Sequence, residues 1–133
     1  MTTPKILVAE DDQAFRHEVG VFLRQNGFEV VCVEDGYQAV EFALREEPDL
    51  LLLDVHMPAG DGFSVHERLQ RHPHLALCPV IYMTHDPSER IEQIAAADGA
   101  YTLFHKPFAL DDLVDAVIHA LNRDSGAARS DAA

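Results

Sequence analysis

A run of four leucines between two aspartates, DLLLLD at residues 49–54, constrains the fold of this chain most strongly. A surface helix or a half-exposed strand would interleave polar residues, but this run leaves no face for water. Such a run is typical of a strand that is covered on both faces within a parallel sheet. The turn-forming residues Pro58, Gly60 and Gly62 follow closely. The sequence therefore predicts a buried central strand that ends at Asp54.

Short apolar runs alternate with stretches of helical periodicity along the whole chain. The predicted strands cover residues 5–9, 28–33, 49–54, 80–83 and 100–104. The predicted helix starts are Asp12, Asp35, Gly62 and Asp86–Pro87, and a last helix carries an apolar stripe of Leu110, Leu113, Val114, Val117, Ile118 and Leu121. This alternation predicts an α/β fold, a doubly wound five-stranded parallel sheet with helices on both faces.

Composition narrows the class of partner and the domain count. The 133 residues include 10 Lys and Arg against 23 Asp and Glu, a net charge of −13. Such a surface repels phosphate backbones and anionic lipids, so we expect no direct nucleic-acid binding and no membrane. The acids near the N-terminus and the lack of a long apolar run favour a cytoplasmic location. We expect one domain over residues 1–122, followed by a flexible polar tail or the start of a linker over residues 123–133.

Polar side chains follow four of the predicted strands at their carboxyl ends. They are Glu10, Asp11 and Asp12 after the first strand, Asp54 after the third, Thr84 after the fourth, and His105, Lys106 and Pro107 after the fifth. Ligands of open α/β sheets bind beyond these ends, where the strand order reverses. In the flavodoxin-like order 2-1-3-4-5 the first and third strands are neighbours, so Glu10, Asp11 and Asp54 are expected in one pocket.

A pocket of this kind has a recognisable chemistry. Two carboxylates about 4 Å apart repel by about 1 kcal/mol in water and by about 4 kcal/mol at a partly buried site. A site of oxygen ligands alone suits Mg²⁺, which would relieve this repulsion. Lys106 adds a fixed positive charge and Thr84 a hydroxyl donor. A carboxylate in such surroundings can attack phosphorus and form an aspartyl phosphate.

The same residues closely resemble the signature of the receiver domain of two-component response regulators. The matching motifs are Glu10-Asp11, Asp54 with Met57-Pro58 and Asp61-Gly62, Thr84, and Lys106-Pro107-Phe108. The resemblance covers residues 4 to about 122. It implies a (βα)5 domain in which Asp54 accepts a phosphoryl group from a sensor histidine kinase or a histidine phosphotransfer protein. Phosphotransfer and slow hydrolysis would be self-catalysed, without the turnover of a classical enzyme.

The resemblance also implies a metal site. Asp11 corresponds to the direct Mg²⁺ ligand, Glu10 to an acid that acts largely through water, and Asp54 to a further ligand. The backbone carbonyl of His56 corresponds to the fourth protein ligand. Asp12 would then cap the first helix instead of binding the metal.

Switching is implied in the same way. Lys106 resembles the phosphoryl-binding lysine, joined by a cis peptide bond to Pro107, and Thr84 resembles the switch hydroxyl that moves toward the new phosphate. The repacked surface would comprise the fourth helix, fifth strand and fifth helix. It would act on a downstream protein or a covalently linked output domain, and a homodimer through it is also considered. This face would present Arg90, Glu92, Gln93, His105, Asp111 and Asp115.

Two residues depart from the usual family pattern. Leu103 stands where an aromatic rotamer switch often lies, so we expect a backbone or leucine repacking instead. His85 stands where a small residue is usual and would crowd the pocket mouth. We interpret His56, His85 and His105 as rim residues that tune the access of water and of the phosphoryl donor to the pocket. A sharper hypothesis is that these histidines make the rates of phosphoryl transfer or hydrolysis depend on pH near neutrality.

Three alternatives stay open at this point. The chain is either a stand-alone regulator or phosphorelay intermediate, or the N-terminal receiver of a longer regulator. A phosphohydrolase that uses an aspartyl phosphate is disfavoured, because His56 stands where such enzymes commonly carry a second acid. A phosphorylation-independent interaction module is disfavoured because every part of the pocket is present.

Overall fold

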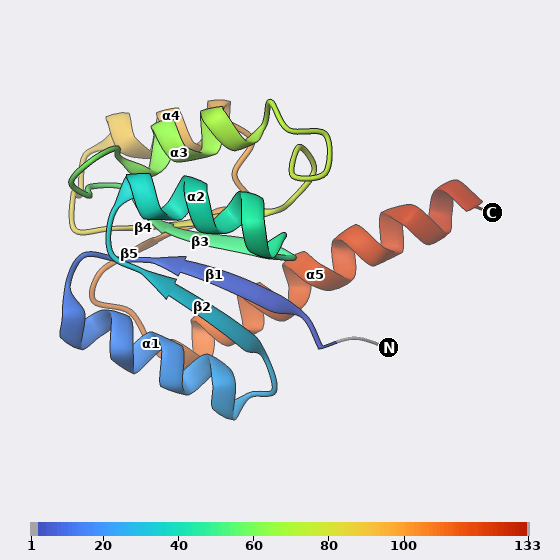
Figure 1. Ribbon diagram of the computed structural model, residues 1–133, viewed down its shortest axis with the longest axis horizontal. Coiled ribbons are helices and arrows are strands. Elements are labelled where there is room, and N and C mark those ends of the chain that lie inside the picture. The colour runs from blue at the N-terminus through green and yellow to red at the C-terminus, as the bar shows by residue number, and fades with distance from the viewer. Residues whose placement is uncertain (1–2, 133) are drawn as a thin grey trace.

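The computed structural model describes residues 3–132, and the side chains of residues 3–123. Strands and helices alternate in the order β1 (Lys5–Ala9), α1 (Gln13–Gln25), β2 (Glu29–Val33), α2 (Gly36–Glu46), β3 (Leu50–Asp54), α3 (Gly62–Leu69), β4 (Val80–Thr84), α4 (Glu89–Ala97), β5 (Thr102–His105) and α5 (Leu110–Ala132). All strand pairs are parallel, in the order β2-β1-β3-β4-β5. Helices α2, α3 and α4 cover one face of the sheet, and α1 and α5 cover the other (Figure 1). The predicted fold class and strand order are confirmed.

The leucines of β3 form the centre of the core. Leu50, Leu51, Leu52 and Leu53 are all 0% exposed. They alternate between the two faces: Leu51 and Leu53 pack in the cluster beneath α2, α3 and α4, and Leu50 and Leu52 pack in the cluster beneath α1 and α5. Because each buried leucine contributes about 1.5–3 kcal/mol, the register of β3 is strongly determined. Asp54 consequently emerges at the carboxyl edge of the sheet, paired with Met83 of β4.

Aspartates begin the helices that follow the first three strands. The Asp12 side chain accepts a hydrogen bond from Phe15 N at 3.0 Å, and the Asp35 side chain accepts one from Gln38 N at 2.7 Å. Asp61 caps α3 in the same manner. A capping aspartate satisfies an N–H group that has no partner within the helix and contributes about 1 kcal/mol. The cap role predicted for Asp12 is therefore confirmed.

The predicted start of α4 at Asp86–Pro87 is wrong. The helix begins at Glu89 after Ser88, whose side chain makes no capping hydrogen bond. The Asp86 carboxylate accepts a hydrogen bond from Ser88 N at 2.9 Å, and Asp86 N donates to Thr84 Oγ1 at 3.0 Å. These bonds form a tight turn over the residues before the helix, so the helix starts later in the chain than predicted.

One further boundary and one burial prediction differ from the structure. Strand β5 begins at Thr102, because Ala100 N still donates to Ala95 O in the turn that ends α4. In α5 the predicted stripe residue Ile118 is 41% exposed, while Ala120 is buried at 2% exposure. The helical backbone of α5 continues to Ala132, and the role of residues 123–133 as a tail or linker stays a prediction.

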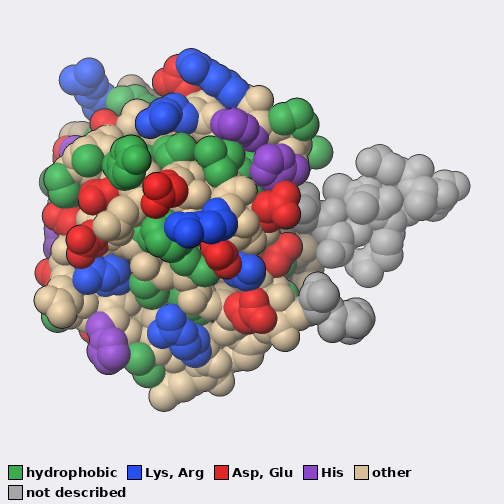
Figure 2. Space-filling model, in the orientation of Figure 1, with side chains coloured by type: hydrophobic (Ala, Val, Ile, Leu, Met, Phe, Trp, Pro, Cys, Tyr) green, Lys and Arg blue, Asp and Glu red, His purple; other side chains and the backbone are tan. Residues whose placement is uncertain are grey.

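The surface mixes charges of both signs. Figure 2 shows acidic and basic side chains interspersed with hydrophobic ones on the face that carries α2 and the β2 edge of the sheet. Over the part of the chain that the structure describes, every helix is too short or too polar to cross a membrane.

Candidate functional site

Three acids converge where β1 and β3 end side by side. One carboxylate oxygen from each of Glu10, Asp11 and Asp54 lies within 4.8 Å of the other two. Glu10 and Asp54 are almost completely buried, whereas Asp11 is exposed. The strand order brings these acids together as predicted, although more than forty residues separate Asp11 from Asp54. Among the described residues, these three acids form the group whose side chains lie close enough together to bind one metal ion.

A hollow of about 300 Å³ opens above these acids. Its lining comprises Glu10, Asp11, Asp12, Asp54, His56, His85 and Lys106. Thr84 is not part of this lining: it is fully buried, and its hydroxyl accepts the hydrogen bond from Asp86 N. The predicted acids, the lysine and two of the histidines therefore line one hollow. The predicted switch hydroxyl of Thr84 lies outside it and is hydrogen-bonded to the loop that follows β4.

Lys106 provides the positive charge within the cluster. Its Nζ donates hydrogen bonds to Glu10 Oε1 and to Asp54 Oδ2, and its side chain is 5% exposed. Burial alone would lower the pKa of Lys106, but the two carboxylates outweigh burial and raise that pKa above its usual range. The residue is anchored through Lys106 N, which donates to Thr84 O at 2.8 Å, and the Lys106–Pro107 peptide bond is cis, as the resemblance implies.

The charge of the cluster is not balanced by this lysine. Burial, and next the side chain of Asp54, raise the pKa of Glu10 to about 7 against the opposing effect of Lys106. Asp12 N donates to Glu10 Oε2 at 3.1 Å, and His56 N donates to Asp54 Oδ1 at 2.9 Å. Both buried carboxylates are thus oriented by hydrogen bonds, yet the site favours a proton or a further cation. A set of oxygen donors of this kind fits a hard divalent cation.

The histidines near the site have different surroundings. His56 Nε2 lies 3.6 Å from Asp86 Oδ2, so the loops that follow β3 and β4 meet at the mouth of the hollow. His85 lines the hollow directly. His105, in contrast, lies 2.8 Å from Glu92 of α4 through its Nε2. The hypothesis that histidines tune access to the site therefore keeps His56 and His85 as its candidates.

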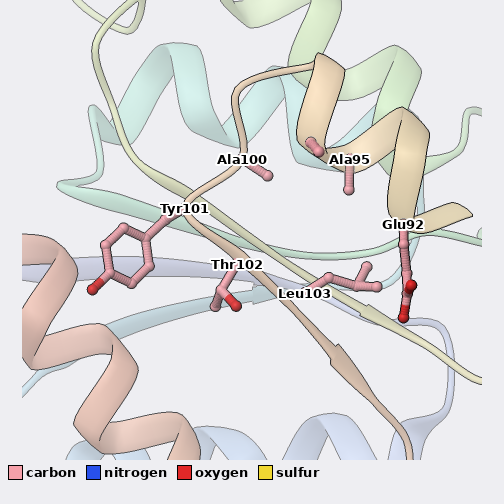
Figure 3. Close-up of a pocket in the computed structure, with 7 residues that line it drawn as sticks. Glu92, Ala95, Ala100, Tyr101, Thr102 and Leu103 are labelled. Carbon is pink, nitrogen blue, oxygen red and sulfur yellow. The ribbon is translucent and has the colours of Figure 1, made fainter.

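Leu103 lies in a separate groove between α4 and β5. The groove is lined by Glu92, Ala95, Ala96, Ala100, Tyr101, Thr102 and Leu103. In Figure 3 the Leu103 side chain points toward α4, and Tyr101 points the opposite way, toward α5. The Leu103 position thus belongs to the α4–β5 surface, outside the acidic hollow.

Two residues of α1 contact the site although the sequence reasoning assigned them no role there. The ring of Phe15 lies 4.9 Å from Lys106 Nζ, and Arg16 Nη1 donates to Glu10 O at 2.8 Å. The sequence feature that could have identified both residues is their position in the first helical turn, directly after the acids.

The comparisons with known proteins all point to one family. The family model for the response regulator receiver domain matches residues 6–118. The transcriptional regulatory protein PdtaR of Mycobacterium tuberculosis is 32% identical over 120 residues, which is 90% of this chain and 57% of PdtaR. The response regulator MprA of Mycobacterium leprae is 38% identical over 119 residues, 90% of this chain and 51% of MprA.

A solved structure agrees with these sequence matches. The chemotaxis response regulator CheY4 of Vibrio cholerae superposes with a TM-score of 0.83 at 27% identity, over 90% of this chain and 99% of CheY4. The chain therefore matches a whole solved receiver structure but spans about half the length of the curated relatives it matches.

Proposed function

Since the chain belongs to the response regulator receiver domain family, we propose that it is a Mg²⁺-dependent phosphorylation switch with Asp54 as the phosphoacceptor. Receiver domains of response regulators accept phosphoryl groups from histidine kinases. The observation that carries the assignment to Asp54 is its position: a buried carboxylate that touches Lys106 and lies within 4.8 Å of two further acids. The donor would be a sensor histidine kinase or a histidine phosphotransfer protein.

The acid cluster would hold the metal ion. Asp11 would bind Mg²⁺ directly, Glu10 largely through water, and Asp54 and the backbone carbonyl of His56 would complete the protein ligands. The raised pKa of Glu10 supports this assignment, because burial and the neighbouring Asp54 disfavour a negative charge that a bound cation would stabilise. When bound, Mg²⁺ supplies charge neutralisation for the phosphoryl oxygens.

The transfer step requires no proton from Asp54. A carboxylate oxygen of Asp54 attacks phosphorus while the bond from phosphorus to the donor's imidazole nitrogen breaks, and the electron pair leaves with the imidazole. Lys106 is already in contact with Asp54, so its ammonium can follow the charge onto the phosphoryl group. Water later attacks the phosphorus, which releases phosphate and restores the carboxylate.

Output would begin at Thr84. Its hydroxyl now accepts the bond from Asp86 N, and turning it toward the phosphoryl group would break that bond and release the loop before α4. The surface of α4, β5 and α5 would then repack around Leu103, without an aromatic switch. This surface would act on a downstream protein or a linked output domain, or form a homodimer.

The proposal extends to the architecture of the whole protein. Residues 1–122 would form the receiver, and residues 123–133 would be a tail or the start of a linker. The matched segments make up 57% of PdtaR and 51% of MprA, which supports a linked output domain. The protein would work in the cytoplasm, and the receiver itself would not bind nucleic acid.

Intact-mass analysis after incubation with acetyl phosphate tests the switch. We expect a gain of one phosphoryl group in the presence of Mg²⁺ and none in EDTA. Asp54→Asn should abolish the gain, whereas Asp61→Asn, which keeps a helix-capping side chain on α3, should retain it. A parent protein that gains no mass in Mg²⁺, or an Asp54→Asn variant that gains as much as the parent, would contradict the proposal.

A further inference from the structure

Arg16, in the first turn of α1, holds the backbone of the acids that follow β1. Its Nη1 donates to Glu10 O at 2.8 Å and to Asp11 O at 3.4 Å. Its backbone N donates to Asp12 O at 2.9 Å. The carbonyl groups of all three residues of this acid turn, defined as residues 10–12, therefore accept hydrogen bonds from one arginine.

The guanidinium also has a partner just beyond the end of the neighbouring strand. Arg16 Nη2 lies 3.8 Å from Oε2 of Glu34, the residue that follows β2. Glu34 N in turn donates to Gln38 Oε1 of α2 at 3.1 Å. The planar fork of an arginine can serve several acceptors at fixed angles, which a lysine ammonium does less well. The Arg16 side chain is mostly buried, at 17% exposure, so this arrangement is tightly held.

We propose that Arg16 is a positioning residue for the magnesium site. The carbonyl and the side chain of a residue leave the same short backbone segment, so fixing the carbonyls of Glu10 and Asp11 restricts where their carboxylates point. Both carboxylates then face Asp54 before the cation arrives. The inference rests on the proposed function of the acid cluster, and it assigns Arg16 to orientation of the ligands, with no contact to the metal or the phosphoryl group.

The chain contains a matched control in Arg24. This arginine lies on the same helix, lines the same surface hollow beside Cys32, and also donates to a backbone carbonyl, that of Val30 at 3.2 Å. Its bond goes to β2 and not to the acid turn. Arg16→Met and Arg24→Met thus remove the same chemical group from one helix, and they differ in which backbone loses its donor.

The test is a Mg²⁺ titration of the full chain by isothermal calorimetry. Outer partners of metal ligands typically contribute tenfold or more to affinity, so Arg16→Met should raise the Kd for Mg²⁺ by about tenfold. Arg24→Met and Glu34→Gln should keep the parent Kd, because the carbonyl bonds to the acid turn remain. At saturating Mg²⁺, Arg16→Met should recover the parent yield of phosphorylation, since Asp54 and Lys106 are intact.

The outcomes separate the inference from the proposed function. If the parent binds Mg²⁺ and Arg16→Met binds it equally well, the inference is refuted and the proposed function stands. If Arg24→Met weakens binding as much as Arg16→Met, the effect belongs to α1 in general and the inference is again refuted. A parent that binds no Mg²⁺ refutes both. Should Arg16→Met fail to fold, Arg16→Lys keeps the charge without the fork and is expected to raise the Kd by a smaller factor.

Discussion

Replacing Asp11 with asparagine should stabilise the protein while it removes the response to magnesium. Asp11 has carboxylate neighbours in Glu10 and Asp54 within 4.8 Å. At that separation a pair of charges repels by about 0.9 kcal/mol in water and by about 3.5 kcal/mol at an effective dielectric constant of 20. Lys106 touches both of those neighbours and cancels about one of the two repulsions. Because Asp11 is exposed, we expect a gain of about 1 kcal/mol, near the aqueous end of the range.

Thermal unfolding measured by far-ultraviolet circular dichroism gives the readout, since the chain has no tryptophan. For a domain of this size, 1 kcal/mol corresponds to a Tm increase of about 3–5 °C in EDTA. Magnesium should raise the Tm of the parent by binding the folded state, and should leave the Tm of Asp11→Asn nearly unchanged.

Asp12→Asn is the matched control for this prediction. It removes an adjacent negative charge, yet asparagine caps α1 as well as aspartate does. This variant should keep the magnesium response of the parent. A lower Tm for Asp11→Asn in EDTA would refute the electrostatic reasoning, and an undiminished magnesium response would refute the assignment of Asp11 as a ligand.

Further predictions concern Glu10, Gly36 and Tyr82. The pKa of Glu10, raised to about 7, means that protons compete with Mg²⁺, so affinity measured by calorimetry should be about tenfold weaker at pH 6 than at pH 8, and Glu10→Gln should flatten this dependence. In EDTA, the contribution of Glu10 to the free energy of unfolding is fully present below pH 4.5 and is lost as pH rises through 7. Gly36→Ala would place Cβ 2.0 Å from Gly60 O, and urea unfolding should show a loss of about 3 kcal/mol, whereas a neutral change would contradict the close packing. Tyr82→Phe removes the hydroxyl that donates to Asp98 and should cost about 1–3 kcal/mol without altering Mg²⁺ affinity.

Much of the fold followed from local patterns of burial and of helix capping. The run at residues 49–54 predicted a strand covered on both faces, and the observed strand has that environment. Aspartates at positions 12 and 35 predicted helix starts because capping is decided within three residues. The gathering of the acids after β1 and β3 followed from the strand order, which parallel α/β chains restrict to few choices.

The features that the sequence did not predict depend on which of several possible partners a side chain takes in the folded protein. Asp86 carries the signature of a helix start, but Thr84 and Ser88 occupy its amide and its carboxylate, so the helix begins later. Ile118 fits the apolar spacing of its helix, yet the sheet is covered by neighbouring positions and leaves it exposed. The bonds of Arg16 to two backbone carbonyls involve no hydrophobic or charge pattern and become visible only in three dimensions.

The central claim is that Asp54 carries the phosphoryl group. Borohydride reduces an acyl phosphate of aspartate to homoserine, so treatment of the phosphorylated protein followed by peptide mass spectrometry locates the modified residue. The account predicts homoserine at position 54, dependent on Mg²⁺ and on prior phosphorylation. Homoserine at another acid of the cluster, or a stable phosphate on a histidine of the rim, would contradict it.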